Sequence, residues 1–199
     1  MELEYKWQFP QDTMQALAEY LHGLPGSLPQ ETLHMEAEYY DSPERFAYKT
    51  GAALRLRREN SRTVCCLKQT VQKEGAKALR EEYETEAETV AEGLKKLPAA
   101  GAPAELCLAL SLQPLAVFAR TQFIRNCRML SPDGTFTAEF AVDAGHLGNP
   151  KRMLPFEELE LEFKSGDAAA FQQFAEDLQK RFALVPQPLS KLARAAAAQ

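Results

Sequence analysis

The sequence opens with Met1-Glu2-Leu3-Glu4-Tyr5-Lys6-Trp7, in which charged and apolar residues alternate. Successive side chains of a β-strand point to opposite faces of the sheet. This stretch therefore predicts a strand with two carboxylates and one ammonium on one face and three apolar side chains on the other. One such strand is usually half-buried with a solvated polar face. A functional role for the charged face is therefore indicated only if the same alternation occurs in other segments of the chain.

The pattern returns in later stretches that carry charged residues on one strand face: residues 54–57, 64–69, 80–84, 137–143 and 158–163. The outer face of a soluble sheet usually mixes Thr, Ser, Gln and Lys, whereas several of these stretches present only acids or only bases. The repetition favours a dedicated charged surface over an ordinary solvated face.

The composition is that of an ordinary soluble domain. The 199 residues are 45% hydrophobic and 26% charged, and we expect one domain over 1–199. A net charge of −5 gives no indication of a nucleic-acid-binding surface. The chain begins with a charged strand, so we expect neither a signal peptide nor a membrane-spanning segment. The cysteines at positions 65, 66, 107 and 127 show no metal-ligand spacing, which favours reduced thiols in a cytoplasmic protein.

Turn and breaker residues divide the chain into eight predicted strands, at residues 1–9, 31–40, 52–59, 62–69, 79–87, 115–130, 135–143 and 154–164. Helices are expected over 12–21 with Asp12 as the N-cap, in short or broken form over 41–51 and 87–112, over 167–182, and around Lys191. The charged residues 72–77 are predicted to form a loop. Most neighbouring strands are joined by hairpin turns, such as those at 59–62 and 131–134.

Strands joined mainly by hairpins predict one antiparallel sheet, and closing it into a barrel removes its edges. The helices need an apolar surface to pack against, so we place the apolar positions outside and the charged positions in the lumen. Removing charges from water is costly without partners, so a charged lumen indicates a polyanionic ligand with metal ions. The predicted fold is α+β dominated by β: an eight-stranded antiparallel closed barrel, or tunnel, with helices packed outside. Trp7 is expected to pack under a helix, and Arg58 to be exposed.

The charged stretches also resemble, in order, the motifs of the CYTH domain family, also called the triphosphate tunnel metalloenzymes. Glu2-Leu3-Glu4-Tyr5-Lys6 is similar to the ExExK signature of this family. The other similar segments are Tyr39-Tyr40-Asp41, residues 51–57, Lys68, residues 80–83, Phe123-Ile124-Arg125, Glu139 with Asp143, residues 158–162 and Leu189-Ser190-Lys191. The resemblance covers residues 2 to about 194 and is greatest to the bacterial inorganic triphosphatase branch. Members of that branch often continue into a helical polyphosphate-binding domain, which we do not expect in this chain.

The sixth predicted strand departs from the family pattern, in which Lys-x-Arg is frequent. Here Arg120 and Arg125 lie in opposite strand phase, so only one of them can face a tunnel unless a bulge intervenes. We place Arg125 in the lumen.

The charge types predict the chemistry of the lumen. Arginine can bind phosphate through two parallel hydrogen bonds, and lysine acts as a point charge. Carboxylates do not bind phosphate directly, so their presence indicates Mg²⁺ or Mn²⁺, which bind carboxylate and phosphate oxygens together. The predicted substrate-binding residues are Lys6, Arg55, Arg57, Lys68, Arg80, Arg125 and Lys191. The predicted metal ligands are Glu2, Glu4, Asp143, Glu158 and Glu160, and pairing of the first and last strands is expected to bring the four glutamates together. The predicted catalytic residues are Glu2, Glu4, Lys6, Glu82 and Glu139.

These features favour a divalent-metal-dependent hydrolase that converts inorganic triphosphate (tripolyphosphate) to pyrophosphate and phosphate. Two alternatives stay open. One is an enzyme of the same family acting on an organic triphosphate, either a thiamine triphosphatase or an adenylate cyclase. The other is a non-catalytic polyphosphate-binding module. An organic base would need an aromatic platform, for which Tyr40, Phe46 and Tyr48 are candidates. The sequence predicts neither the preferred metal nor the oligomeric state.

Overall fold

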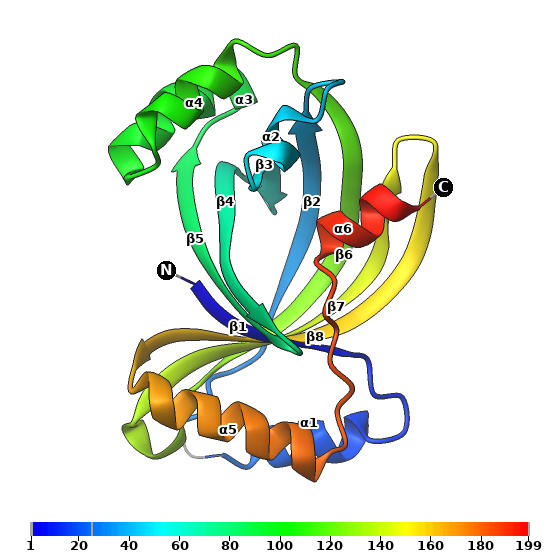
Figure 1. The fold of residues 1–199 in the computed structure, drawn as a ribbon. Coiled ribbons are helices and arrows are strands. Elements are labelled where there is room, and N and C mark those ends of the chain that lie inside the picture. Colours follow the sequence, from blue (N-terminus) through cyan, green and yellow to red (C-terminus); the bar gives the residue numbers. More distant parts are fainter. Residues whose placement is uncertain (1, 25, 199) are drawn as a thin grey trace.

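The computed structural model describes residues 2–24 and 26–198, without the side chains of residues 70, 71 and 73. The described strands form one closed antiparallel barrel in the order β1-β5-β4-β3-β2-β6-β7-β8 (Figure 1). Their bounds are β1 (Glu2–Gln8), β2 (Glu31–Asp41), β3 (Ala52–Glu59), β4 (Arg62–Glu74), β5 (Lys77–Glu86), β6 (Ala116–Leu130), β7 (Phe136–Asn149) and β8 (Arg152–Gly166). The predicted fold class is therefore confirmed.

Several strands are longer than the sequence predicted. β4 continues to Glu74 and β5 begins at Lys77, so the loop expected over 72–77 is wrong and only a tight turn at 75–76 remains. The charged run was interpreted as a loop, but it pairs with β5 after a register shift between Thr70 and Gln72. β7 continues to Asn149, six residues beyond its expected end, because its far half pairs with both β6 and β8.

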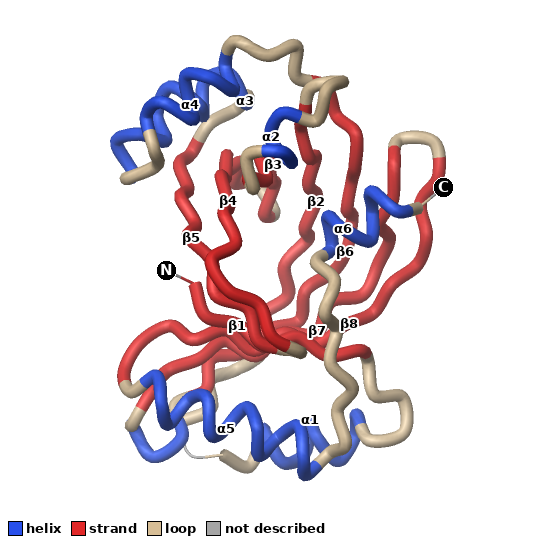
Figure 2. The backbone as a smooth tube through the Cα atoms, viewed as in Figure 1, coloured by secondary structure: helices blue, strands red, loops and turns tan. Residues whose placement is uncertain are grey.

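Two helices pack against the outside of the barrel at one end, below the strands in Figure 2. They are α1 (Met14–His22) and α5 (Ala168–Arg181). Trp7 is fully buried beneath α5, and its Nε1 donates a hydrogen bond to Gln179 at 2.8 Å, as expected for the apolar face of β1. The expected Asp12 cap is wrong, since α1 begins after Thr13 and has no side-chain cap.

A second group of helices covers β3, β4 and β5. It comprises α3 (Val90–Lys96), the 3₁₀ turn η1 (Leu97–Ala100) and α4 (Ala104–Ser111), while the short α2 (Phe46–Lys49) follows β2 and η2 (Pro132–Gly134) joins β6 to β7. Gly93 allows α3 to lie directly on β4, because a Cβ at this position would come within 2.3 Å of the Cys65 side chain. Within the described ranges, no helix is long and apolar enough to cross a membrane.

The last helix, α6 (Lys191–Ala197), lies against β6 and β7 and lines the central cavity. The segment before it pairs with the end of β1: the amide of Gln8 donates to Val185 at 2.8 Å, and that of Gln187 donates to Lys6 at 2.9 Å. This pairing starts where β5 stops covering β1, since the β1–β5 register ends at Tyr5. The chain is thereby led back to the barrel, and Lys191 reaches its interior.

Candidate functional site

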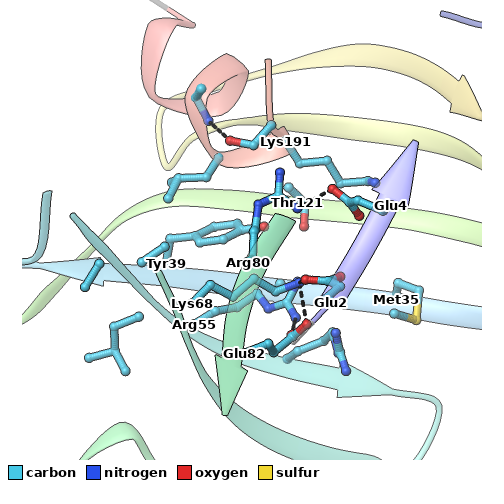
Figure 3. A pocket seen from close by; sticks show the side chains of 18 of the residues that line it. Glu2, Glu4, Met35, Tyr39, Arg55, Lys68, Arg80, Glu82, Thr121 and Lys191 are labelled. Atoms are coloured by element: carbon cyan, nitrogen blue, oxygen red, sulfur yellow. Dashed lines mark hydrogen bonds and ion pairs between the residues drawn. The ribbon is translucent and has the colours of Figure 1, made fainter. Parts of the chain in front are cut away.

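A cavity of about 900 Å³ runs through the barrel, with charged side chains on its walls (Figure 3). Most of the predicted site residues line it: Glu2, Glu4, Lys6, Arg55, Arg57, Lys68, Arg80, Glu82, Arg125, Glu139, Glu160 and Lys191. Asp143 and Glu158 do not, because both are fully buried behind the lining side chains. Strand alternation thus brings charged side chains from seven strands to a common interior, and β2 contributes mainly apolar and aromatic side chains.

The wall formed by β3, β4 and β5 carries alternating bases and acids. Lys68 Nζ lies 3.0 Å from Glu2 and 2.8 Å from Glu82. Arg55 lies 3.4 Å from Glu82 and 3.7 Å from Glu84. Each cation is therefore held by carboxylates from other strands, one or two places away in the barrel order, and the wall contains no uncompensated run of one charge.

These pairs keep both partners charged. Burial by itself would lower the pKa of Lys68, but Glu2 and Glu82 outweigh burial and raise it. Burial would raise the pKa of Glu82, but Lys68 and Arg55 lower it below its ordinary value. The wall therefore presents permanent positive charges at neutral pH, as a phosphate-binding surface requires.

Cys66 is the lumen-facing thiol of β4 and donates to Glu82 at 3.0 Å. Its sulfur and the carboxylates of Glu82 and Glu84 lie within 4.8 Å of one another. Burial raises the pKa of Cys66 to about 12, so it remains a neutral thiol. A neutral thiol beside Arg55 and Lys68 is a poor metal ligand.

The centre of the cavity holds a tightly packed trio from β1 and β5. Arg80 forms an ion pair with Glu4, and Lys6 Nζ lies 3.4 Å from the same carboxylate. All three side chains are buried. Burial lowers the pKa of Lys6, an effect that Glu4 opposes and Arg80 reinforces, so this ammonium releases its proton more readily than an exposed lysine.

Asp143, Glu158 and Glu160 form what we call the acid cluster, in which the ligand oxygens lie within 4.8 Å of one another. Lys191 Nζ lies 2.7 Å from Asp143 and 2.8 Å from Glu160, and it also contacts Glu158. Arg125 donates two hydrogen bonds to Asp143, at 2.8 and 2.7 Å, and it also contacts Glu160.

The members of the acid cluster differ in their environments. Burial would raise the pKa of Glu160, but Lys191 and Arg125 hold it well below its ordinary value. Burial dominates at Glu158 and raises its pKa despite Lys191 and Arg194. The acid cluster therefore depends on its cations to remain ionised.

β1 and β8 pair as predicted. Glu4 lies opposite Glu162, and Lys6 lies opposite Glu160. The expectation that Glu2 and Glu4 join Glu158 and Glu160 is therefore wrong: among the described residues, the acid cluster contains neither β1 glutamate. An antiparallel pair has a register that the residue types of the two strands do not fix, and here it places a base of β1 against the acids of β8.

Arg125 faces the tunnel and Arg120 does not. Arg120 lies outside the barrel, where it pairs with Glu38 at 2.8 Å and is half exposed. β6 pairs with β7 without a register shift from Arg120 onward, so no bulge changes the alternation between the two arginines. Arg58 is exposed as predicted.

Some tunnel residues were not predicted. Arg194 pairs with Glu158 behind Lys191. Its position three residues after Lys191 was a usable signal, because residues i and i+3 share a helix face. Lys164 lines the cavity and pairs with Glu162 at 2.9 Å, and it continues the phase of the β8 glutamates.

The acid cluster fits a divalent metal ion. Its donors are all carboxylate oxygens, which hard divalent ions prefer. The ammonium of Lys191 lies among the three carboxylates, which shows that the cluster accommodates a cation.

The structure is thus a closed antiparallel barrel that surrounds a cavity lined by paired basic and acidic side chains. This chain belongs to the CYTH domain family, whose model matches residues 1–196. The members of this family are enzymes that act on triphosphates.

Solved structures share the fold. A Hippeastrum protein that carries the name of an adenylyl cyclase, and that is described as having a dominant triphosphatase activity, is 15% identical, with a TM-score of 0.64 over 99% of this chain and 96% of that one. A Bacillus halodurans protein named as an adenylate cyclase is 17% identical, with a TM-score of 0.56 over 96% and 94% of the two chains. A Pyrococcus horikoshii protein is 19% identical, with a TM-score of 0.55 over 98% and 97%.

Proposed function

We propose that this protein hydrolyses inorganic triphosphate to pyrophosphate and phosphate, with Mg²⁺ or Mn²⁺ as the cofactor. The observation that carries the proposal is the combination, in one barrel interior, of cavity walls that carry several bases with the acid cluster, of which Glu160 lines the cavity and Asp143 and Glu158 lie behind it. A basic wall alone would bind an anion, and an acid cluster alone would bind a cation. Both together suit a ligand in which phosphate oxygens and a metal ion are bound side by side.

The bases bind and orient the phosphate chain. Arg55 and Arg57 project from one strand toward the cavity, so they can hold neighbouring phosphate groups through their planar forks. Lys68 and Arg80 add charge from the adjoining strands, and Arg125 adds it from the opposite wall. Holding the chain in one geometry supplies much of the catalysis that phosphoryl transfer needs, because that reaction depends on positioning and charge neutralisation.

The acidic side chains have two proposed roles, to bind metal ions and to orient the basic side chains. Asp143, Glu158 and Glu160 would hold the ion, which when bound neutralises phosphate charge and lowers the pKa of a water molecule. We propose Glu2 and Glu4 as ligands of a second ion. Further catalytic contributors are Glu82 and Glu139, which orient Arg55 and Arg125 across 3.4 Å each, and Lys6, whose lowered pKa suits proton exchange near the reacting phosphate.

A substrate panel tests the proposal. Phosphate release is measured with triphosphate, ATP, thiamine triphosphate and long polyphosphate, each with Mg²⁺, Mn²⁺ or EDTA. We expect triphosphate to have the highest kcat/KM and EDTA to abolish turnover. Faster turnover of an organic triphosphate would replace the substrate assignment, and binding without turnover of any compound would favour the polyphosphate-binding alternative.

One observation favours the organic alternative. The cavity extends to a mouth lined by Tyr39, Tyr48, Phe118 and Arg45. The Arg45 guanidinium lies 4.3 Å from the Phe118 ring centre and 5.5 Å from that of Tyr48, and Tyr48 is 71% exposed. An aromatic and cationic mouth could hold a planar organic group while the phosphates occupy the charged interior.

A further inference from the structure

The charges at the acid cluster are balanced by cationic side chains of this chain. Asp143, Glu158 and Glu160 supply three negative charges, and Arg125, Lys191 and Arg194 supply three positive charges in direct contact with them. Asp143 and Glu158 are fully buried, and the cavity does not reach them. A divalent ion could therefore bind the cluster only if a cation made room for it.

The three cations differ in how firmly the fold holds them. Arg125 belongs to β6, which is paired along its length with β2 and β7. Lys191 and Arg194 belong to α6, a helix of seven residues near the end of the chain. α6 has a small apolar contact, in which Ala195 and Leu192 pack with a cluster that includes Phe123 and Phe156. Movement of α6 breaks no strand pairing, whereas movement of Arg125 would distort the barrel wall.

Lys191 lies where its charge interacts with all three carboxylates at once. A divalent ion bound by the same oxygens would be within a few ångströms of the ammonium and would repel it strongly in a buried site. We infer that Lys191 is a built-in cation of the acid cluster, and that a divalent metal ion and Lys191 occupy the cluster in alternation, so that metal binding releases α6.

This inference rests on the metal part of the proposed function and extends it. Once released from the carboxylates, Lys191 is free to turn to the phosphate chain, which accounts for a proposed substrate-binding lysine whose contacts are with three acids. Arg194 leaves Glu158 with the same movement, because both cations share one short helix. Metal entry and opening of the cavity at α6 become a single event.

The test uses Mn²⁺ alone, without substrate, so that turnover plays no part. Lys191→Met keeps the length of the side chain and removes the competing charge. Lys151→Met is the matched control, since Lys151 is exposed in the turn between β7 and β8. Calorimetric titration should show Mn²⁺ binding to Lys191→Met at least about tenfold more tightly than to the wild type or to Lys151→Met. In the wild type, saturating Mn²⁺ should make the amides of residues 191–197 exchange with deuterium at least about tenfold faster.

Equal or weaker Mn²⁺ binding by Lys191→Met would overturn the inference and leave the triphosphatase proposal intact. Absence of Mn²⁺ binding in both proteins would overturn the inference together with the proposed cofactor. If Lys191→Met does not fold, the wild-type exchange experiment decides, because unchanged or slower exchange of α6 in Mn²⁺ means that the metal does not displace it.

Discussion

Arg57 and Arg58 are adjacent on β3 and form a matched pair for testing the tunnel. Arg57 lines the cavity with its side chain 15% exposed, and it lies 2.6 Å from Glu59 and 2.9 Å from Glu84. Arg58 points to the outer face and is exposed. The two substitutions remove the same side chain from neighbouring residues, so any difference between them reports the face of the strand.

The magnitude follows from the contacts that Arg57 can make. A hydrogen bond involving a charged group contributes about 1.5–3 kcal/mol, and each 1.4 kcal/mol is a factor of about ten in Kd. In the free protein Arg57 already pairs with Glu59 and Glu84, and triphosphate must compete with these partners. We therefore expect Arg57→Ala to weaken triphosphate binding near the lower end of this range, by about tenfold. Arg58→Ala should change the Kd by less than about twofold.

Calorimetric titration of triphosphate with Ca²⁺ in place of the catalytic ion measures this difference without turnover. Circular dichroism of both variants checks that the barrel is intact. Comparable losses in the two variants would mean that the charged face of β3 does not hold the ligand. A larger loss in Arg58→Ala would place the ligand on the outer surface.

Three further measurements test the site. Glu160→Gln keeps the size of the side chain and removes one charge from the acid cluster, so metal-dependent turnover should fall by about 100-fold or more. The control Glu157→Gln changes an exposed residue and should retain the wild-type kcat. Equal rates in the two variants would exclude the acid cluster as the metal site. Triphosphate at one hundred times its Kd stabilises the folded state by about 2.7 kcal/mol, which should raise the Tm by about 5–10 °C. Mg²⁺ alone should give a smaller rise. If triphosphate leaves the Tm of an intact barrel unchanged, the charged strand faces are not the binding site. Burial raises the pKa of Glu162 to about 7, an effect that Lys164 only partly offsets. Ionisation of Glu162 therefore destabilises the folded protein progressively as the pH rises from the ordinary pKa of a glutamate through 7. The Tm of Glu162→Gln minus that of the wild type should increase between pH 5 and pH 8, and a constant difference would contradict a buried Glu162.

The sequence was sufficient to predict most of the residues that line the tunnel, because the strand period is two and most strands carry several charges in one phase. The same rule separated Arg57 from Arg58 and placed Trp7 under a helix, where it is fully buried.

The partner of each charge could not be predicted in this way. The register between β1 and β8 sets Lys6 opposite Glu160 and separates Glu4 from the acid cluster. Strand length could not be predicted from the residue pattern either. The residues of β4 after Thr70 have a charged composition typical of a loop, and they form a strand because they pair with β5. Register and length are decided by barrel closure, which involves all strands together.

The position of Lys191 depends on the path of the chain rather than on periodicity. The segment before α6 pairs with the end of β1 and brings the helix to the cavity. The result is a tunnel in which the bases and acids pair with one another before any ligand arrives. Triphosphate alone would take bases from their carboxylates, and a metal ion alone would take carboxylates from their bases. Either ligand leaves buried charges without partners, which is costly, whereas both together provide every group with a new partner. The pairing of bases with acids therefore favours joint binding of metal and triphosphate over binding of either one.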